Sequence, residues 1–273
     1  MNKIKNINDI LISFNRIKSM TSGLITNFYP NNDKIDSWIS RGSIFLKDYA
    51  HSAFIVRYHM DFKYLFFISN SLKQLEIDLV NFLHAIDIDI VTEIVGTQDS
   101  NISQIELFQQ HGFCLHEILV RMQTIKNEII SKSEYADEVE NAQIKDSKRI
   151  QNFLINRLDK YSEQIPDIPE IETLINNKSI LIIRKQDSIG GLLIYENTGI
   201  LSHLREWHVN KDYRNEKIGS KLIKSYFNLS RECKRFILWV KNENLDAINR
   251  YKHYGYKEDK LIDQILVKRK LKT

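Results

Sequence analysis

Apolar positions in the second half of the chain follow two spacings, one typical of strands and one typical of helices. Short runs rich in β-branched and aromatic residues predict strands. Between them apolar residues recur at helical spacing, and one helical stretch opens at a capping Asn244 and closes at Gly255. The order β-β-β-α-β-α-β after a first helix predicts a mixed sheet flanked by helices. The predicted elements are helices at 148–158, 216–233 and 244–254, and strands at 180–184, 190–195, 201–209, 236–240 and 261–268.

The first half of the chain repeats part of this pattern. A helix end that runs into a strand occurs twice, 136 positions apart, and a later helix with its closing corner recurs 143 positions apart. An ordered repeat of this kind favours two copies of one α/β unit. The matching stretches are Ser37–Leu46 with Thr173–Ile182, Asn101–Ser103 with Asn244–Asp246, and Phe108–Phe113 with Tyr251–Tyr256.

A polar and charged stretch at 130–141 separates the two copies. Its composition is typical of a linker or a solvated segment rather than of a buried element. We therefore place the domain boundary near residue 135, which gives one domain at 1–135 and a second at 136–273.

Composition excludes several classes of protein. The 273 residues carry 39 Lys and Arg against 35 Asp and Glu, and the net charge of +4 is too small for the dense cationic face of a dedicated nucleic-acid binder. The two cysteines, Cys114 and Cys233, make no disulfide framework and no metal-ligand pattern, so we expect no metal. No apolar run is long enough to span a bilayer, and the first twenty residues do not resemble a signal peptide. We expect a cytoplasmic protein with no membrane partner.

Residues 203–223 carry the most informative chemistry. A strand ending at Val209 is followed by a short basic loop and then by a helix whose first amides have no partner in the sequence pattern. Free N–H groups and the positive end of a helix form an anion site suited to a pyrophosphate. Gly219 lets a ligand approach the backbone closely, and Arg214 and Lys217 add positive charge. A plain strand–loop–helix connection with surface cations is the alternative interpretation of this segment alone.

This segment resembles the acyl-CoA signature of the GNAT superfamily of N-acyltransferases, whose loop reads Q/R-x-x-G-x-G/A after a strand ending in Val. Arg214 takes the first position and Gly219 the last, while Lys217 stands where the family usually has its first glycine. The strand at 236–240 and the run from Asn244 through Tyr251 to Gly255 resemble the family's second motif. The resemblance covers about residues 140–273 and implies an α/β (α+β) fold with a mixed, mostly antiparallel sheet, here in two tandem copies.

The resemblance also implies roles for individual residues. The backbone around Val209 would pair with the pantetheine arm of acetyl-CoA, and the loop amides would hold its pyrophosphate. Tyr251 would protonate the departing CoA thiolate as general acid, since a phenol can donate a proton; a core tyrosine is the alternative. The residues that the resemblance assigns to the acyl-CoA are Trp207, His208, Val209, Arg214, Asn215, Glu216, Lys217, Ile218, Gly219, Ser220 and Asn244.

The sequence offers two candidates for the general base. Strand alternation predicts that His203, Arg205 and Val209 share one face with Trp207, and that Glu206 faces the other way. His203 is the first candidate for the base because an imidazole accepts protons near neutral pH. Glu206 is the reserve candidate, and Arg205 is a candidate to bind an anionic group on the acceptor.

The first copy lacks the residues that the second copy would use. At the offset of 143, its loop falls on Ser71–Glu76, with Glu76 opposite Gly219 and Phe108 opposite Tyr251. A carboxylate repels phosphate, and a phenyl ring has no proton to donate. Residues 1–130 are therefore interpreted as a degenerate GNAT-like domain, with an unrelated α/β fold as the alternative.

Two functions remain after this reasoning. The first is an acyl-CoA-dependent N-acyltransferase that moves an acetyl group to a primary amine by direct attack in a ternary complex. The second is a non-catalytic module that senses acyl-CoA or binds a protein. The acceptor is a small-molecule or peptide amine whose identity the sequence leaves open, as it does the oligomeric state, with a homodimer among the options.

Overall fold

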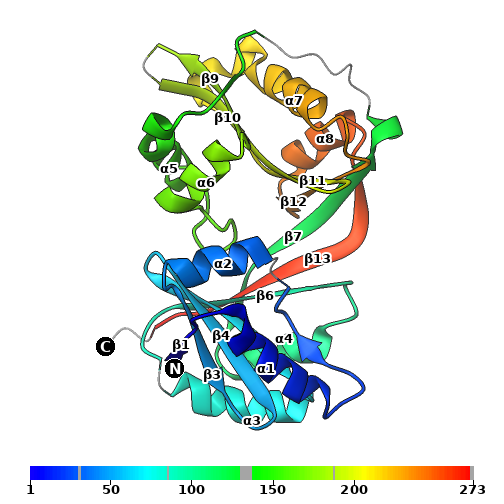
Figure 1. Cartoon of the computed structure of the whole chain (residues 1–273). Helices are drawn as coiled ribbons and strands as arrows, with labels where there is room; N and C mark the ends of the chain where they lie inside the picture. Colours follow the sequence, from blue (N-terminus) through cyan, green and yellow to red (C-terminus); the bar gives the residue numbers. More distant parts are fainter. Residues whose placement is uncertain (30–31, 85, 130–136, 187, 271–273) are drawn as a thin grey trace. The chain divides into compact units, whose positions relative to one another are not determined.

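A computed structural model describes residues 1–29, 32–84, 86–129, 137–186 and 188–270 (Figure 1). The chain divides into two compact units. The first unit contains Met1–Ile118 and the C-terminal segment from Leu261, and the second contains Leu119–Lys260. Among the helices in these ranges, none combines the length and apolar composition needed to cross a membrane.

The first unit is a sheet with two helices on each face. Its strands lie in the order β1-β3-β4-β5-β6-β13, and the short strand β2 is an additional partner of β5. The elements are β1 (Asn2–Lys3), α1 (Ile7–Lys18), β2 (Ile25–Thr26), α2 (Asn32–Ser40), β3 (Ile44–Asp48), β4 (Ser52–His59), β5 (Phe62–Ser69), α3 (Leu72–Leu83), β6 (Ile90–Gly96) and α4 (Ile102–Gln110).

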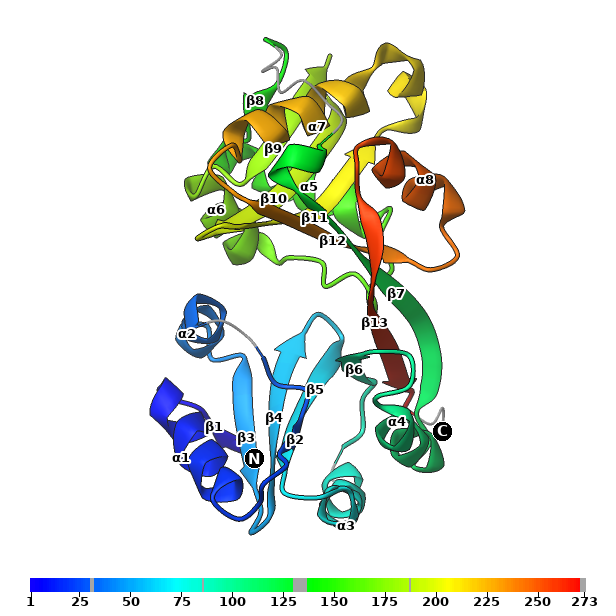
Figure 2. The same ribbon diagram turned by 90° about the vertical axis from the view of Figure 1, so that its right-hand side faces the viewer.

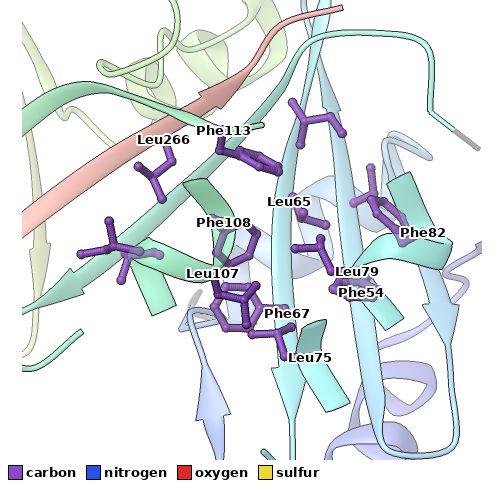
Figure 3. Packing of buried hydrophobic residues seen from close by; sticks show 14 residues of the cluster. Phe54, Leu65, Phe67, Leu75, Leu79, Phe82, Leu107, Phe108, Phe113 and Leu266 are labelled. Atoms are coloured by element: carbon purple, nitrogen blue, oxygen red, sulfur yellow. The ribbon is translucent and has the colours of Figure 1, made fainter. Parts of the chain in front are cut away.

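Two apolar clusters hold these layers together. On one face α1 and α2 bury Ile17 and Trp38 against β3, β4 and β5. On the other face, α3 and α4 bury Leu79 and Phe108 against sheet residues such as Phe67, as Figure 3 shows. Alternate strand residues therefore supply both cores, which is why β4 and β5 are buried at nearly every position.

The second unit has the strand order β7-β12-β11-β10-β9-β8. Figure 2 shows α7 lying along this sheet. The elements are β7 (Cys114–Ile125, in this unit from Leu119), β8 (Glu140–Asn141), α5 (Ser147–Ile155), α6 (Ile168–Asn176), β9 (Ile180–Lys185), β10 (Ser188–Thr198), β11 (Leu201–Val209), α7 (Ile218–Leu229), β12 (Arg235–Lys241), α8 (Leu245–His253) and β13 (Lys257–Lys268, in this unit to Lys260), with short 3₁₀ turns at Lys126–Glu128, Ile144–Asp146 and Lys211–Glu216.

The two faces of the second sheet are covered by different helices. Leu192 and Ile194 of β10 pack in one cluster with apolar residues of α5 and α6. On the opposite face α7 lies close to β10, where a Cβ on Gly191 would stand 2.4 Å from the Cγ2 of Ile218. A glycine is required at Gly191 because any side chain would push α7 off the sheet.

Most of the last strand of each half lies in the other half's unit. In the second unit β7 pairs antiparallel with β12 from Leu119↔Lys241 to Ile125↔Arg235. In the first unit β13 pairs antiparallel with β6 from Ile262↔Gly96 to Lys268↔Ile90. The compact units therefore differ from the division at residue 135, and residues 130–136 around that boundary lie outside the described residues. Glu140–Asn141, which the composition assigned to a linker, forms β8 and pairs with β9.

The repeat seen in the sequence is a repeat of structure. The helix end before a strand recurs as α2 before β3 and α6 before β9. Asn101 and Asn244 precede α4 and α8, and the glycines after these helices, Gly112 and Gly255, have φ of 86° and 93°. The predicted α/β class with a mostly antiparallel sheet is confirmed, and the helix expected at 216–233 is shorter, at Ile218–Leu229.

Candidate functional site

Strands β11 and β12 start as parallel neighbours and then stop pairing. They pair from Leu201↔Arg235 to Leu204↔Leu238, and the pairing ends there. Beyond this point no described strand pairs with the facing edge of residues 205–209. We call the ends that no longer pair with each other, 205–209 of β11 and 239–241 of β12, the β11–β12 splay. An unpaired strand edge presents N–H and C=O groups that can bind an extended ligand.

A β-bulge at Arg205 changes which face of the sheet the later side chains of β11 point to. Opposite β10, Leu204 pairs with Tyr195 and Glu206 with Ile194, so Arg205 has no partner of its own. As a result Ser202 and Trp207, five residues apart, both hydrogen-bond α7 residues: Ser202 Oγ lies 2.8 Å from Tyr226 Oη, and Trp207 Nε1 donates to the Gly219 oxygen at 3.2 Å. Unbroken alternation would place them on opposite faces.

The bulge corrects the predicted grouping of side chains. Trp207 and Val209 lie on the α7 face, not with His203 as alternation predicted. Glu206 and His208, paired with Ile194 and Leu192, lie on the α5–α6 face together with His203. The expectation that Glu206 faces away from His203 is wrong, because the extra residue shifts every later side chain by one position.

The helix after β11 begins without a side-chain cap. Lys217 precedes α7 in the left-handed conformation, with φ of 58°, and no described side chain caps the first amides of the helix. A Cβ on Gly219 would lie 3.3 Å from Trp207 and from Val209, so a glycine keeps the first turn close to the end of β11. Exposed amides at a helix N-terminus beside an unpaired strand edge fit a ligand that joins an extended amide arm to phosphates.

Residues 149–256 match the acetyltransferase (GNAT) family. This part of the chain is a GNAT domain. No curated protein sequence matches the chain significantly.

Solved structures extend the likeness of fold to the whole chain. A tandem GNAT protein from the clavulanic acid biosynthesis pathway has 8% identity and a TM-score of 0.62, with 98% of this chain and 96% of that chain covered. A GCN5-related N-acetyltransferase from Sphaerobacter thermophilus has 12% identity and a TM-score of 0.60 over 88% of this chain and 85% of that chain. A GNAT-family acetyltransferase from Colwellia psychrerythraea has 10% identity and a TM-score of 0.55, with 98% of each chain covered. At these identities the likeness shows the fold, which is two tandem GNAT copies.

Tyr251 of the GNAT domain lies next to the β11–β12 splay. Its ring is 5.7 Å from that of Trp207 and 5.9 Å from that of Tyr256, measured between centroids. No described group hydrogen-bonds its hydroxyl. Burial raises the pKa of Tyr251, and the negative charges of Glu206 and Glu163 raise it further. The phenol is therefore protonated at neutral pH and can donate a proton.

The two candidate bases differ in their surroundings. Glu206 lies at the start of the β11–β12 splay, where its carboxylate contacts His208 with 2.8 Å between Oε2 and Nε2. His203 lies where β11 is still paired on both sides, opposite Glu196 and Ile237. Only the first of these positions lies beside the unpaired strand edge.

Two predicted binding residues already have partners. Arg205 donates from Nη1 to Glu196 at 3.1 Å, and this ion pair reduces its capacity to bind an anionic acceptor. Asn244 accepts a hydrogen bond from the Ala247 amide at 3.1 Å and so caps α8. Its Nδ2 remains the group that can donate to a ligand.

The charges of the loop before α7 are mixed. Arg214, Asn215 and Lys217 are exposed, and Glu216 pairs with Lys185 at 2.6 Å. Because this ion pair neutralises the carboxylate, Glu216 does not oppose phosphate binding as strongly as an unpaired glutamate would. Ile218 is buried, so only its backbone can serve a ligand, while Ser220 is half-buried.

Sequence reasoning missed Glu163 and Lys241. Glu163 lies in the turn between α5 and α6, and its Oε2 is 3.9 Å from the Nζ of Lys241 at the end of β12. Both residues lie outside the family motifs, and only the folded chain brings them near Glu206. Within the described residues, no group of three or more His, Cys, Asp or Glu is arranged to hold a metal ion.

Helix α3 of the first copy corresponds to α7, but it does not start at the position that the offset of 143 predicts. Helix α3 follows Ser71 as α7 follows Lys217, so the second helical residues, Lys73 and Gly219, are structural equivalents. The match of Glu76 to Gly219 is therefore wrong by three positions, because the connection before α3 is shorter. The first copy still lacks a glycine at this point. Phe108, the residue matched to Tyr251, is fully buried.

Proposed function

We propose that the second copy is an acyl-CoA-dependent N-acyltransferase that moves an acetyl group from acetyl-CoA to a primary amine. The observation that carries the proposal is the end of β11–β12 pairing at Leu204↔Leu238, next to the uncapped α7 and to Tyr251. These three features supply an edge for an amide-containing arm, amides for a pyrophosphate and a proton donor for a thiolate.

Binding of the donor would use main-chain groups. The β11 edge from Trp207 to Val209, including His208, would hydrogen-bond the pantetheine arm and polarise the thioester carbonyl. Amides from Ile218 to Ser220 would hold the pyrophosphate, with Arg214 and Lys217 adding charge. Asn244 would donate from Nδ2 to the arm.

The reaction needs two proton transfers. The amine nitrogen attacks the thioester carbonyl carbon, the C–S bond breaks, and the nitrogen loses a proton as the amide forms. Glu206, supported by His208, accepts that proton, and Tyr251 donates its own to the CoA sulfur. The phenolate then regains a proton from Glu206 directly or through water, so the enzyme returns to its starting state.

The two groups assist each other electrostatically. The charge of Glu206 is one reason why the pKa of Tyr251 is raised. Once Glu206 has accepted the amine proton it is neutral, and the pKa of Tyr251 falls in that step. The phenol is therefore a stronger acid when the thiolate leaves than in the resting enzyme.

Free-thiol release from acetyl-CoA across a panel of primary amines tests this function. We expect amine-dependent release by the wild type, and a fall of about 100-fold in turnover with retained acetyl-CoA affinity for Tyr251→Phe. Equal turnover of the two proteins would reject Tyr251 as the acid. Binding of acetyl-CoA without release of thiol to any amine would favour the sensing module instead. Light scattering would show whether the chain is the homodimer that the sequence left open.

A further inference from the structure

Glu163 is held in place by a turn that no motif of the family describes. The Asp159 amide donates to Glu163 Oε2 at 2.6 Å, and the Glu163 amide donates to the Asp159 carbonyl at 3.1 Å. The Asp159 carboxylate accepts from the amides of Tyr161 and Ser162, both at 3.0 Å. The Glu163 side chain is 23% exposed and cannot move freely without breaking this turn.

One carboxylate oxygen of Glu163 makes both the hydrogen bond and the ion pair of this side chain within the described residues. Oε2 accepts from the Asp159 amide and lies 3.9 Å from Lys241 Nζ. No described group hydrogen-bonds Oε1. A carboxylate oxygen has two lone pairs, so Oε1 can accept hydrogen bonds from a ligand.

Titratable groups from three other elements lie around Glu163. Glu206 and His208 belong to β11, Tyr251 to α8 and Lys241 to β12. Burial raises the pKa of Glu163. The positive charges of Lys241 and His208 lower this pKa and the negative charge of Glu206 raises it, and the net result lies above the ordinary value. The ionised Glu163 carboxylate is therefore incompletely compensated where it lies, and a cation beside its Oε1 would stabilise it.

We propose that Glu163 binds the ammonium group of the acceptor and selects acceptors without a nearby carboxylate. The assignment rests on the proposed function. The ammonium would donate a hydrogen bond to Oε1 of Glu163 and would release one proton to solvent to become the neutral amine. The second proton leaves the nitrogen during attack and is accepted by Glu206, as in the proposed reaction. An anionic acceptor is disfavoured because Arg205, the cation predicted to receive it, is already paired with Glu196.

Three amines of the same chain length test the selection: diaminobutane, butylamine and aminobutanoate, each with its groups on the terminal carbons. We expect the kcat/KM of the wild type to fall at least 10-fold from butylamine to aminobutanoate, with diaminobutane the best of the three. Glu163→Gln should lower kcat/KM for butylamine at least 10-fold, mainly through KM, and should narrow the gap to aminobutanoate. Glu243→Gln, which neutralises an exposed carboxylate near Lys241, is the matched control and should change neither value.

Calorimetry with acetyl-CoA separates the inference from the proposed function. Glu163→Gln should bind acetyl-CoA as tightly as the wild type, because Glu163 lies on the acceptor side. If acetyl-CoA does not bind to the wild type, the proposed function fails. If acetyl-CoA binds and amines are acetylated, but Glu163→Gln behaves as the wild type or aminobutanoate is preferred, only the role of Glu163 is overturned. Binding of acetyl-CoA with none of the three amines acetylated also overturns it.

Discussion

The parallel strand pairs β5–β6 of the first unit and β11–β12 of the second unit both diverge after a few residues. In the first unit, another segment of the chain pairs with the strand edge that the divergence leaves open. In the first unit β5 and β6 pair in parallel only at Lys63↔Ile90 and Tyr64↔Val91. Beyond these pairs, β2 adds to the exposed edge of β5 through Ile25↔Ser69 and Thr26↔Ile68. In the second unit, the equivalent edge of β11 has no such partner among the described residues.

Asn27 completes the closure of the first unit. Its Nδ2 donates to the carbonyls of Leu65 on β5 and Glu93 on β6, at 3.3 and 3.0 Å, and to Thr92 Oγ1 at 3.0 Å. Its Oδ1 accepts from the Phe67 amide at 2.7 Å. One side chain thus bridges both diverging strands and satisfies the main-chain groups that an extended amide ligand would use.

The helix starts differ as well. Two residues, Asn70 and Ser71, join β5 to α3, whereas eight residues, 210–217, join β11 to α7. Ser71 caps α3 through its hydroxyl, which accepts from the Gln74 amide at 3.3 Å. The first copy therefore lacks the long loop before the helix, and the Gln74 amide in the first turn of α3 is already occupied. A copy can thus lose parts of a ligand site by satisfying them internally while the sheet is kept.

Replacing the proposed base, Glu206, should have the largest effect in the second copy. We expect Glu206→Gln to lower turnover about 100-fold or more, because the amine proton loses its acceptor. His203→Gln should retain turnover within a few fold, since His203 lies in the paired part of β11. Steady-state kinetics with acetyl-CoA and butylamine would decide, and a reversed order would restore His203 as the base.

Asn27, which plugs the opening between β5 and β6, should stabilise the first unit, and its removal should not create an acetyl-CoA site. Asn27→Ala leaves main-chain groups of β5 and β6 without partners, and we expect a loss of about 2–3 kcal/mol in the free energy of unfolding. Denaturant titration measures this loss. A second acetyl-CoA site in this variant would contradict the view that the short β5–α3 connection also prevents binding.

The cap of α3 should contribute only to stability. We expect Ser71→Ala to cost about 1 kcal/mol of unfolding free energy, because the Gln74 amide loses its acceptor. The affinity for acetyl-CoA, measured by calorimetry, should stay at the wild-type value. Weakened binding would show that the first unit takes part in holding the donor.

The left-handed Lys217 offers the smallest effect. Lys217→Gly and Lys217→Ala both remove the charge, but only glycine adopts a φ of 58° without strain. We therefore expect Lys217→Gly to be more stable than Lys217→Ala by about 1 kcal/mol in thermal unfolding. Equal stability would mean that the turn before α7 adjusts to the side chain.

Local signals account for what the sequence predicted correctly. Asn244 and Gly255 mark the two ends of α8 because a cap and a left-handed corner are properties of neighbouring residues. The bulge at Arg205 has no comparable local signature, so the phase of β11 could not be predicted. The shorter β5–α3 connection was hidden because no matched stretch covers it, so the offset of 143 from the later stretches was applied to a region of different length. Glu163 joins the site only through folding over more than forty residues, which spacing alone does not reveal.

The number of acetyl-CoA molecules bound per chain separates an open second copy from a closed first copy. We expect a stoichiometry of one in calorimetry, with desulfo-CoA competing for the same site on the second unit. A stoichiometry of two would show that the Asn27 plug does not close the first copy. No binding at all would contradict the assignment of the β11–β12 splay as a donor site.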